Sequence, residues 1–277
     1  MNYFKNAITL LWLFVLIPLC HAAQEPPTKP SGIQPVWDIT FARDKVDLQP
    51  SLTGLTDRKM VEMREKKEDI ALPLTGFASM EYLLPTRTAL VKENACGLPG
   101  NACLLEVAPT DPGAQAGSSR GPFLHVFVPP QLWPTSCWRL AFDIVASRRS
   151  TMGGISLTGR GGLPIWDFAF YLDGKMRSVT EEGSVEVCGY TPQKPLHIEV
   201  VIDTISQTVT VYLNQKTPPM VELPWTKQAT KDMSAFVGMH VYGASAGGHC
   251  NQGQVAIDNI RLEPEKPNAE QQPPAAQ

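Results

Sequence analysis

LHIEVVID at residues 196–203, followed by TVTVYLN at residues 208–214, is the part of the sequence that decides the fold class. In both segments every second residue is apolar, so each segment has one apolar face, as a β-strand lying on a core does. Residues 204–207 between the two segments suit a hairpin loop. Two long antiparallel strands of this kind predict the centre of an all-β sandwich.

Further short segments with strand patterns follow at regular spacing along the chain, as an all-β sandwich requires. The segment WRLAFDIVA at 138–146 has the clearest apolar face, and Asp173-Gly174 marks a tight turn. No internal repeat is present. The other predicted strands cover residues 37–41, 77–83, 88–92, 103–107, 123–128, 153–158, 166–172, 175–180, 184–188 and 236–242.

The last apolar segment, QVAIDNIRL at residues 254–262, changes phase in its middle. Its first two apolar residues are in phase with each other, but Ile260 and Leu262 are one residue out of phase with them. A β-bulge inserts one extra residue into a strand and shifts the alternation by one position. We therefore predict a β-bulge near Asp258 and Asn259.

Composition and charge restrict the class of protein. The chain has 277 residues, of which 43% are hydrophobic and 18% charged, which is enough for a sizeable core in one domain. The 21 glycines and 25 prolines favour turns over long helices. The net charge of −3 argues against nucleic acid as a partner, because such proteins carry a basic surface.

The N-terminus has the features of a secretory signal peptide. Lys5 precedes an apolar run at residues 7–19, and Cys20-His21-Ala22 places small residues where cleavage before Ala23 requires them. The run is shorter than the roughly 20 residues of a membrane span, although a retained anchor is the alternative. We predict a signal peptide over 1–22, no stable membrane span after processing, and a secreted or periplasmic protein.

The remaining chain divides into a linker, one domain and a tail. Residues 23–35 are rich in proline and are predicted to form an extended linker, and residues 264–277 are predicted to be disordered. The domain covers residues 36–263. Within it, DRKMVEMREKKED at 57–69 is dense in charge and predicts a short inserted helix, either a solvated surface helix or a lid or docking arm.

Five cysteines remain after the signal peptide, an odd number for an oxidising compartment. Cys96 and Cys103 flank the turn-rich hexapeptide GLPGNA, which can bring them together, and we predict a disulfide between them. One cysteine of the remaining three must then stay free or pair outside the chain. The sequence leaves open which of Cys137, Cys188 and Cys250 this is.

The order of these segments resembles the concanavalin A-like lectin/glucanase jelly roll, a superfamily that includes laminin G-like domains and many secreted carbohydrate-binding modules. The residues that carry the resemblance are 138–144, 168–174, 196–214, 236–242 and 256–260. It covers roughly residues 36–263 and implies a two-sheet antiparallel jelly-roll sandwich. Such modules often hold a structural calcium with an aspartate of the closing strand, which makes Asp258 a candidate ligand, together with Asp38 or Asp44.

The catalytic signatures of the enzymes in this superfamily are missing from the sequence. Glucanases carry Glu-x-Asp-x-Glu on one strand, and the nearest approach here is Glu199 with Asp203. The lyase patterns Arg-x-Glu-x-Arg and Gln-x-His do not occur. The letters GASAG at 243–247 match a nucleophile elbow, but they lie between two predicted strands instead of a strand and a helix. His240, His249 and Cys250 lack the spacing of a zinc site.

Carbohydrate recognition requires exposed aromatic rings, which stack on sugar rings, with polar side chains beside them for the hydroxyls. The first hypothesis is therefore a secreted, non-catalytic recognition module for carbohydrate or a cell-envelope polymer. The alternatives are an atypical polysaccharide-cleaving enzyme of the same fold and a protein-binding adhesion or assembly factor. The candidate ligand-binding residues are Trp166, Arg160, Trp225, Tyr242, Asn251 and Gln252, with Trp133 as a further aromatic candidate.

Overall fold

The computed structural model describes residues 35–50, 77–81, 85–108, 110, 121–147, 153–160, 164–171, 173–180, 183–214, 221–226, 235–243 and 253–265. All of them belong to one compact unit, Ile33–Gln277. The predicted signal peptide, the charged segment at 57–69, the tail beyond residue 265 and Cys250 lie outside the described residues. In the described part of the chain, no helix is long and apolar enough to cross a membrane.

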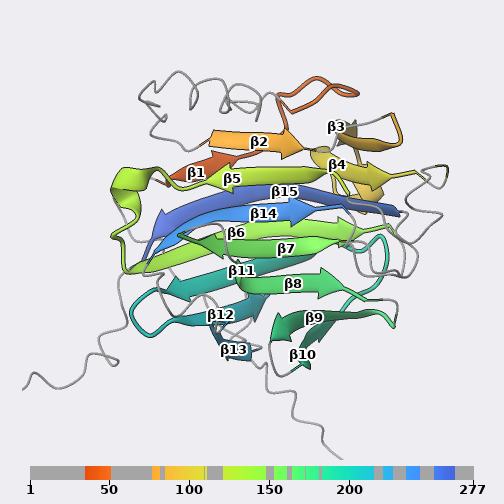
Figure 1. The fold of residues 1–277 in the computed structure, drawn as a ribbon. Coiled ribbons are helices and arrows are strands. Elements are labelled where there is room, and N and C mark those ends of the chain that lie inside the picture. Colours follow the sequence, from red (N-terminus) through yellow and green to blue (C-terminus); the bar gives the residue numbers. More distant parts are fainter. Residues whose placement is uncertain are drawn as a thin grey trace, which may run out of the picture. The chain divides into compact units, whose positions relative to one another are not determined.

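The described residues form two antiparallel sheets (Figure 1). The eight-stranded sheet has the order β13-β12-β11-β6-β15-β4-β3, with β1 paired to β15. Its strands are β1 (Trp37–Ile39), β3 (Arg87–Glu93), β4 (Asn101–Val107), β6 (Cys137–Ala146), β11 (Leu196–Asp203), β12 (Thr208–Leu213), β13 (Val221–Pro224) and β15 (Gly253–Pro264).

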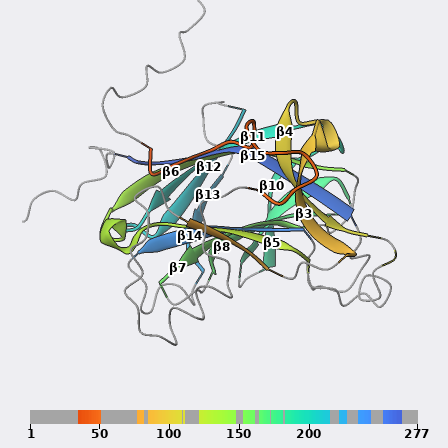
Figure 2. The ribbon, with the colours of Figure 1, turned by 90° about the horizontal axis from the view of Figure 1, so that it is seen from above.

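The seven-stranded sheet has the order β10-β9-β8-β7-β14-β5-β2. Figure 2 shows the two sheets as separate layers, which confirms the predicted jelly-roll sandwich. Two 3₁₀ turns, η1 (Ala95–Gly97) and η2 (Pro130–Leu132), lie between strands. The strands of the seven-stranded sheet are β2 (Phe77–Glu81), β5 (Phe123–Phe127), β7 (Gly154–Gly159), β8 (Pro164–Phe170), β9 (Lys175–Thr180), β10 (Gly183–Gly189) and β14 (Phe236–Tyr242).

A single core cluster of buried aromatic and aliphatic side chains joins the two layers. Phe236 of the seven-stranded sheet packs edge-on against Trp37 and Trp138 of the eight-stranded sheet, with ring centroids 6.1 and 6.2 Å apart. All three rings are fully buried. Burial of apolar surface at roughly 25 cal/mol per Å² makes contacts of this kind the main favourable contribution to folding.

The predicted hairpin and the predicted bulge are both confirmed. β11 pairs with β12 on one side and with β6 on the other, so the hairpin lies inside the sheet. The register between β15 and β6 shifts between Asp258 and Arg261, and Asn259 has a φ of 53°. Asparagine tolerates this left-handed conformation better than most residues, which suits it to the extra position of the bulge.

The closing strand extends beyond the predicted end of the domain at residue 263. β15 reaches Pro264, and the backbone N–H of Glu265 donates to the carbonyl of Cys137 at 2.9 Å. The carboxylate of Glu265 also pairs with Arg139 at 2.6 Å. Residues 264 and 265 are therefore part of the sandwich, since both backbone and side-chain contacts hold them on β6.

The predicted disulfide between Cys96 and Cys103 is wrong for this structure, because the sheet separates the two thiols. Cys103 is fully buried in the core between the layers, whereas Cys96 packs with Ala102 and Leu104 on the outer face of the eight-stranded sheet. Neighbouring residues of a strand point to opposite faces, so Ala102 and Leu104 cannot share a face with Cys103. Cys96, Cys103, Cys137 and Cys188 are all free thiols.

Candidate functional site

Four polar residues form a line across the outer face of the seven-stranded sheet. Asp167 of β8 lies opposite Ser156 of β7, Ser156 opposite His240 of β14, and His240 opposite His125 of β5. Directly opposed residues of neighbouring strands project on the same side of a sheet. We call these four residues the polar row. Their neighbours in sequence, such as Leu157, are buried in the core.

Aromatic rings lie on both sides of the polar row. Phe123 and Tyr242 face each other across β5 and β14 in the adjoining register position, and Phe127 lies beyond His125 on β5. The ring centroids of Phe123 and His240 are 4.4 Å apart, and those of His125 and Phe127 are 5.2 Å apart. We call Phe123, Phe127 and Tyr242 the aromatic flank. All three side chains are partly exposed, so the sheet face combines ring surfaces with polar groups.

Tyr242 and Asp167 are joined by a short hydrogen bond, in which the phenol donates to Oδ1 of the carboxylate at 2.6 Å. Burial raises the pKa of Asp167, and the hydrogen bonds from Tyr242 and the Phe168 backbone oppose this shift only in part. Burial and the neighbouring Asp167 raise the pKa of Tyr242 well above its ordinary value. Tyr242 is therefore a fixed donor, while the carboxylate keeps lone pairs for a second donor.

His240 is neutral at physiological pH. Burial and the adjacent His125, whose ring centroid is 3.5 Å away, lower the pKa of His240 to about 3. Among the described residues, none forms a hydrogen bond with the buried Nε2 of His240. A buried polar atom without a partner costs about 1–3 kcal/mol, so this nitrogen destabilises the fold unless a ligand or a water molecule reaches it.

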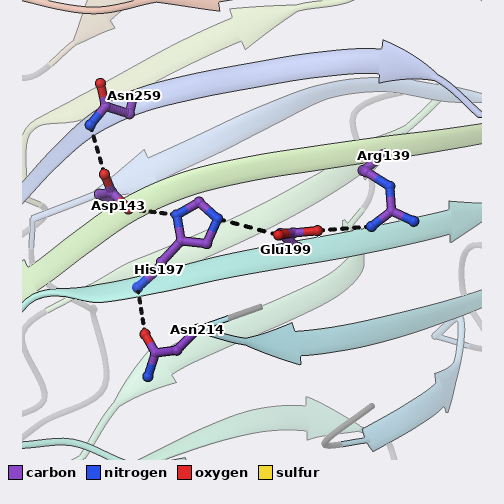
Figure 3. A network of polar contacts seen from close by, with 6 residues as sticks. All are labelled: Arg139, Asp143, His197, Glu199, Asn214 and Asn259. Carbon is purple, nitrogen blue, oxygen red and sulfur yellow. Dashed lines mark hydrogen bonds and ion pairs between the residues drawn. The ribbon is translucent and has the colours of Figure 1, made fainter. Parts of the chain in front are cut away.

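A second polar cluster lies on the outer face of the eight-stranded sheet (Figure 3). His197 of β11 is hydrogen-bonded through Nδ1 to Asp143 at 2.7 Å and through Nε2 contacts Glu199 at 3.4 Å. Asn259 donates to Asp143 at 2.6 Å, and Arg139 donates to Glu199 at 2.8 Å. We call these five residues the ionic network. It links β6, β11 and β15.

The pKa values within the ionic network show that its charges stabilise one another. Hydrogen bonds to Asp143 and Glu199 raise the pKa of His197 to about 9, so this imidazole is charged at neutral pH. The hydrogen bond from His197 is the largest cause of the lowered pKa of Glu199. Burial raises the pKa of Asp143, but hydrogen bonds from His197 and Asn259 outweigh it and the net pKa is lowered.

The two carboxylates of the central hairpin have separate structural roles. Glu199 belongs to the ionic network, whereas Oδ1 of Asp203 accepts the backbone N–H groups of Ile205 and Ser206 at 2.7 and 3.0 Å. Such a hydrogen bond to the following turn is a common use of aspartate in loops. The pair does not form an acid–base constellation, because each carboxylate is already occupied by different partners.

Two of the tryptophans predicted to bind sugar lie in the core. Trp166 is 1% exposed and stacks on Phe168 with ring centroids 5.1 Å apart, and Trp225 is 3% exposed with its indole donating to the carbonyl of Thr208. Their rings are not available for stacking on a ligand in this structure, which corrects that part of the prediction. Trp166 is buried because it is next to Asp167 on β8, so its side chain points to the opposite face of the sheet, into the core.

The other predicted ligand-binding residues occupy varied positions. Tyr242 belongs to the aromatic flank, and Arg160 is exposed at the end of β7. The indole of Trp133 donates to the carbonyl of Val128 at 2.8 Å. Asn251 and Gln252 lie outside the described residues. Sequence reasoning did not identify Phe123, His125, Ser156 or Asp167, although their outward phase on β5, β7 and β8 was a usable signal.

The predicted calcium ligands lie in different environments. Asp258 is buried and accepts the backbone N–H of Phe41 at 3.2 Å, while Asp38 is exposed on β1 and lies opposite Arg261. Within the described ranges, no group of three or more histidine, cysteine, aspartate or glutamate side chains is arranged to hold a metal ion. A structural calcium at Asp258 stays a prediction.

Comparison with known proteins finds similarity at the level of the fold. No family model matches the chain, and no curated protein matches it. A solved sialidase structure has a TM-score of 0.51 and 15% identity, and the match covers 67% of this chain and 16% of that chain. This similarity concerns the fold alone and agrees with a two-sheet β-sandwich.

Two further solved structures show more distant similarity. The receptor-binding domain of botulinum neurotoxin C/D mosaic serotype has a TM-score of 0.44 and 12% identity, with 70% of this chain and 44% of that chain covered. Trypanosoma rangeli sialidase in complex with sialic acid has a TM-score of 0.43 and 12% identity, with 77% and 37% covered. The chain spans less than half the length of each of these three proteins.

Proposed function

We propose that this protein is a non-catalytic recognition module that binds carbohydrate or a cell-envelope polymer on the outer face of the seven-stranded sheet. The observation that carries this proposal is the polar row with its aromatic flank. Sugar rings offer C–H faces to aromatic rings and hydroxyls to polar side chains, so their recognition needs both kinds of group on one surface. Phe123 and Tyr242 beside His240 and Asp167 supply this combination.

The pKa values of His240 and Tyr242 favour binding over proton transfer at these two groups. A general acid or base works best with a pKa near the operating pH. The pKa of His240 is lowered to about 3 and that of Tyr242 is raised well above its usual value, so both move away from neutrality. These groups are suited to donate and accept hydrogen bonds without exchanging protons with a ligand.

The structural comparisons support the fold of this proposal and not its ligand, because the identities are 15% or lower. The activities that the names of the matched proteins state, those of a sialidase and of a toxin receptor-binding domain, apply to those proteins.

We also propose that the module acts outside the cytoplasm, in the periplasm or in the secreted fraction. Sequencing of the mature N-terminus from fractionated cells tests this, with Ala23 as the expected first residue.

A glycan array probed with the purified protein, with release of reducing sugar assayed in parallel, tests the proposed function. We expect retention on at least one glycan and no sugar release. His240→Ala should weaken binding about tenfold, which corresponds to the loss of one well-placed hydrogen bond. His197→Gln, on the other sheet, serves as the matched control. If no glycan on the array retained the protein, the proposal would be contradicted. Release of reducing sugar would favour the atypical enzyme instead.

A further inference from the structure

Asp167 brings a carboxylate to the polar row of the proposed binding face. One of its oxygens accepts the phenol of Tyr242 at 2.6 Å, and the side chain is partly buried. An ionised carboxylate is an acceptor with about four lone-pair positions, so it can bind further donors. Hydroxyl and ammonium groups of a sugar are such donors, and hydrogen bonds to a charged acceptor are stronger than neutral ones.

Two cations of the adjoining strand β9 are already paired with carboxylates. Arg177 forms an ion pair with Asp173, and its guanidinium lies 4.8 Å from the ring centroid of Tyr171. Lys175 forms an ion pair with Glu186 of β10. Among the described residues, neither of these cations pairs with Asp167, whose side chain accepts the phenol of Tyr242. When ionised, Asp167 therefore contributes negative potential to this face.

His240, which lies between Ser156 and His125 in the polar row, does not offset the charge of Asp167 at neutral pH. His240 lies next to Phe123 and His125 and is neutral, because its pKa is lowered to about 3. A second carboxylate or a sulfate placed about 6 Å from Asp167, at an effective dielectric constant of about 20, would bind roughly a hundredfold more weakly through repulsion. This repulsion is screened less at a partly buried site than at an exposed one, and added salt reduces it.

We infer that the polar row selects a saccharide that donates hydroxyl or ammonium hydrogen bonds to Asp167 and carries no negative charge, and that it rejects uronic, sialic and sulfated sugars. This inference rests on the proposed function and names its ligand class. The expected geometry has a sugar ring beside Phe123, a hydroxyl at Nε2 of His240 and a donor at the carboxylate of Asp167. The carboxylate thus acts as the element that determines specificity.

The test compares matched polymers that differ in charge. Hydroxyethylcellulose and carboxymethylcellulose form one pair, dextran and dextran sulfate a second, and chitosan supplies the ammonium form. Affinity electrophoresis and calorimetry at low and at physiological salt measure binding of the purified protein, alongside any glycans retained on the array. We expect the uncharged or ammonium member to bind at least about tenfold more tightly than the acidic one, with the difference reduced by salt.

Two variants and one control assign the discrimination to Asp167. Asp167→Asn should reduce the preference to about twofold or less by raising affinity for the acidic polymers. Asp167→Ser also removes the carboxylate and should reduce the preference in the same way, which covers the case in which Asp167→Asn folds poorly. Asp143→Asn removes a carboxylate from the ionic network on the other sheet and should leave the preference unchanged.

The outcomes separate this inference from the function on which it rests. Retention of no glycan or polymer would overturn the proposed function and the inference together. Tighter binding of acidic polymers by the unaltered protein would overturn only the inference and leave a recognition module in place. An unchanged preference in a folded Asp167→Asn variant would show that another group sets the specificity.

Discussion

His197 and His240 illustrate how the same side chain acquires opposite protonation in one domain. His197 lies between Asp143 and Glu199, and the hydrogen bonds to these carboxylates raise its pKa to about 9. His240 lies against Phe123 and His125, where burial lowers its pKa to about 3. A carboxylate neighbour favours the charged imidazole, and burial favours the neutral one. The first histidine therefore serves stability, and the second is available for a neutral hydrogen bond.

The ionic network makes stability depend on pH in a direction that follows from these shifts. The folded pKa of His197 is raised above its unfolded value, so its contribution is full below about pH 6.5 and is lost as the pH rises through about 9. The folded pKa values of Asp143 and Glu199 are lowered. Their contribution is present above their unfolded values and is lost as the pH falls through the folded values.

Replacement of His197 tests this dependence. Urea denaturation from pH 4 to pH 10 should show that His197→Gln lowers the free energy of unfolding by about 1–2 kcal/mol at pH 7, allowing for solvent screening of partly exposed groups. The variant should also lose less stability than the unaltered protein between pH 7 and pH 10. Lys45→Gln, at an exposed loop position, is the control. Parallel pH profiles for His197→Gln and the unaltered protein would contradict the assignment.

The free cysteines give a second prediction for single residues. Cys103 is 0% exposed, and burial raises its pKa far above the ordinary value, so its thiol should not react with a thiol reagent in the folded protein. Burial raises the pKa of Cys96 to about 11, but this thiol is partly exposed and should react slowly. Alkylation in denaturant without reductant, followed by mass spectrometry, should find both residues modified. A peptide linked through Cys96 and Cys103 would refute this.

At the scale of elements, the β-bulge of β15 determines which residues of the closing strand face the core before and after it. The extra residue brings Val255 and Ile257 before it and Ile260 and Leu262 after it onto the same buried face. It also directs the side chain of Asn259 toward Asp143 of β6, where it donates a hydrogen bond. The bulge therefore keeps the core continuous and adds one donor to the ionic network.

Two substitutions at Asn259 separate these effects. Asn259→Val requires a β-branched residue at a φ of 53° and also removes the hydrogen bond to Asp143, so it should lower the free energy of unfolding by about 2–4 kcal/mol. Asn259→Gly tolerates the backbone conformation and should cost about 1 kcal/mol, mainly for the lost hydrogen bond. Denaturant unfolding of both variants measures the difference. Equal losses would show that backbone conformation contributes little here.

At the scale of the whole molecule, the outer faces of the two sheets have different chemistry. The ionic network on the eight-stranded sheet consists of groups that satisfy one another, as its pKa shifts show. The polar row on the seven-stranded sheet includes the buried Nε2 of His240, which has no hydrogen-bond partner among the described residues. We therefore assign the first face to stability, and the contrast supports the proposed recognition on the second.

This division predicts that stability and binding respond to different substitutions. Glu199→Gln should lower the free energy of unfolding by about 1–2 kcal/mol and leave glycan retention unchanged at temperatures where the variant is folded. Phe123→Ala, on the aromatic flank, should weaken retention about tenfold or more through the lost stacking surface. Circular dichroism before each binding measurement checks that the variants are folded. Loss of retention in folded Glu199→Gln would contradict the division.

Local sequence pattern was sufficient for most of the architecture. The period-two alternation on β6, β11 and β12 predicted these strands and their hairpin, and the phase change in β15 predicted the bulge near Asp258. β13 was missed because its four residues are too short to show alternation. Trp166 was misplaced because it stands at the start of its predicted strand, although it alternates with Phe168 and Phe170, which are also buried.

By itself the sequence determined an all-β sandwich, most of its strands and the turns between them, because these depend on contacts between residues close along the chain. Only the tertiary structure decided which side chains meet. The register between β5, β14, β7 and β8 aligns His125, His240, Ser156 and Asp167 in one row, and the sheet keeps Cys96 apart from Cys103. Strand order and register arise from the packing of distant segments into one core, and local alternation carries no information about that pairing.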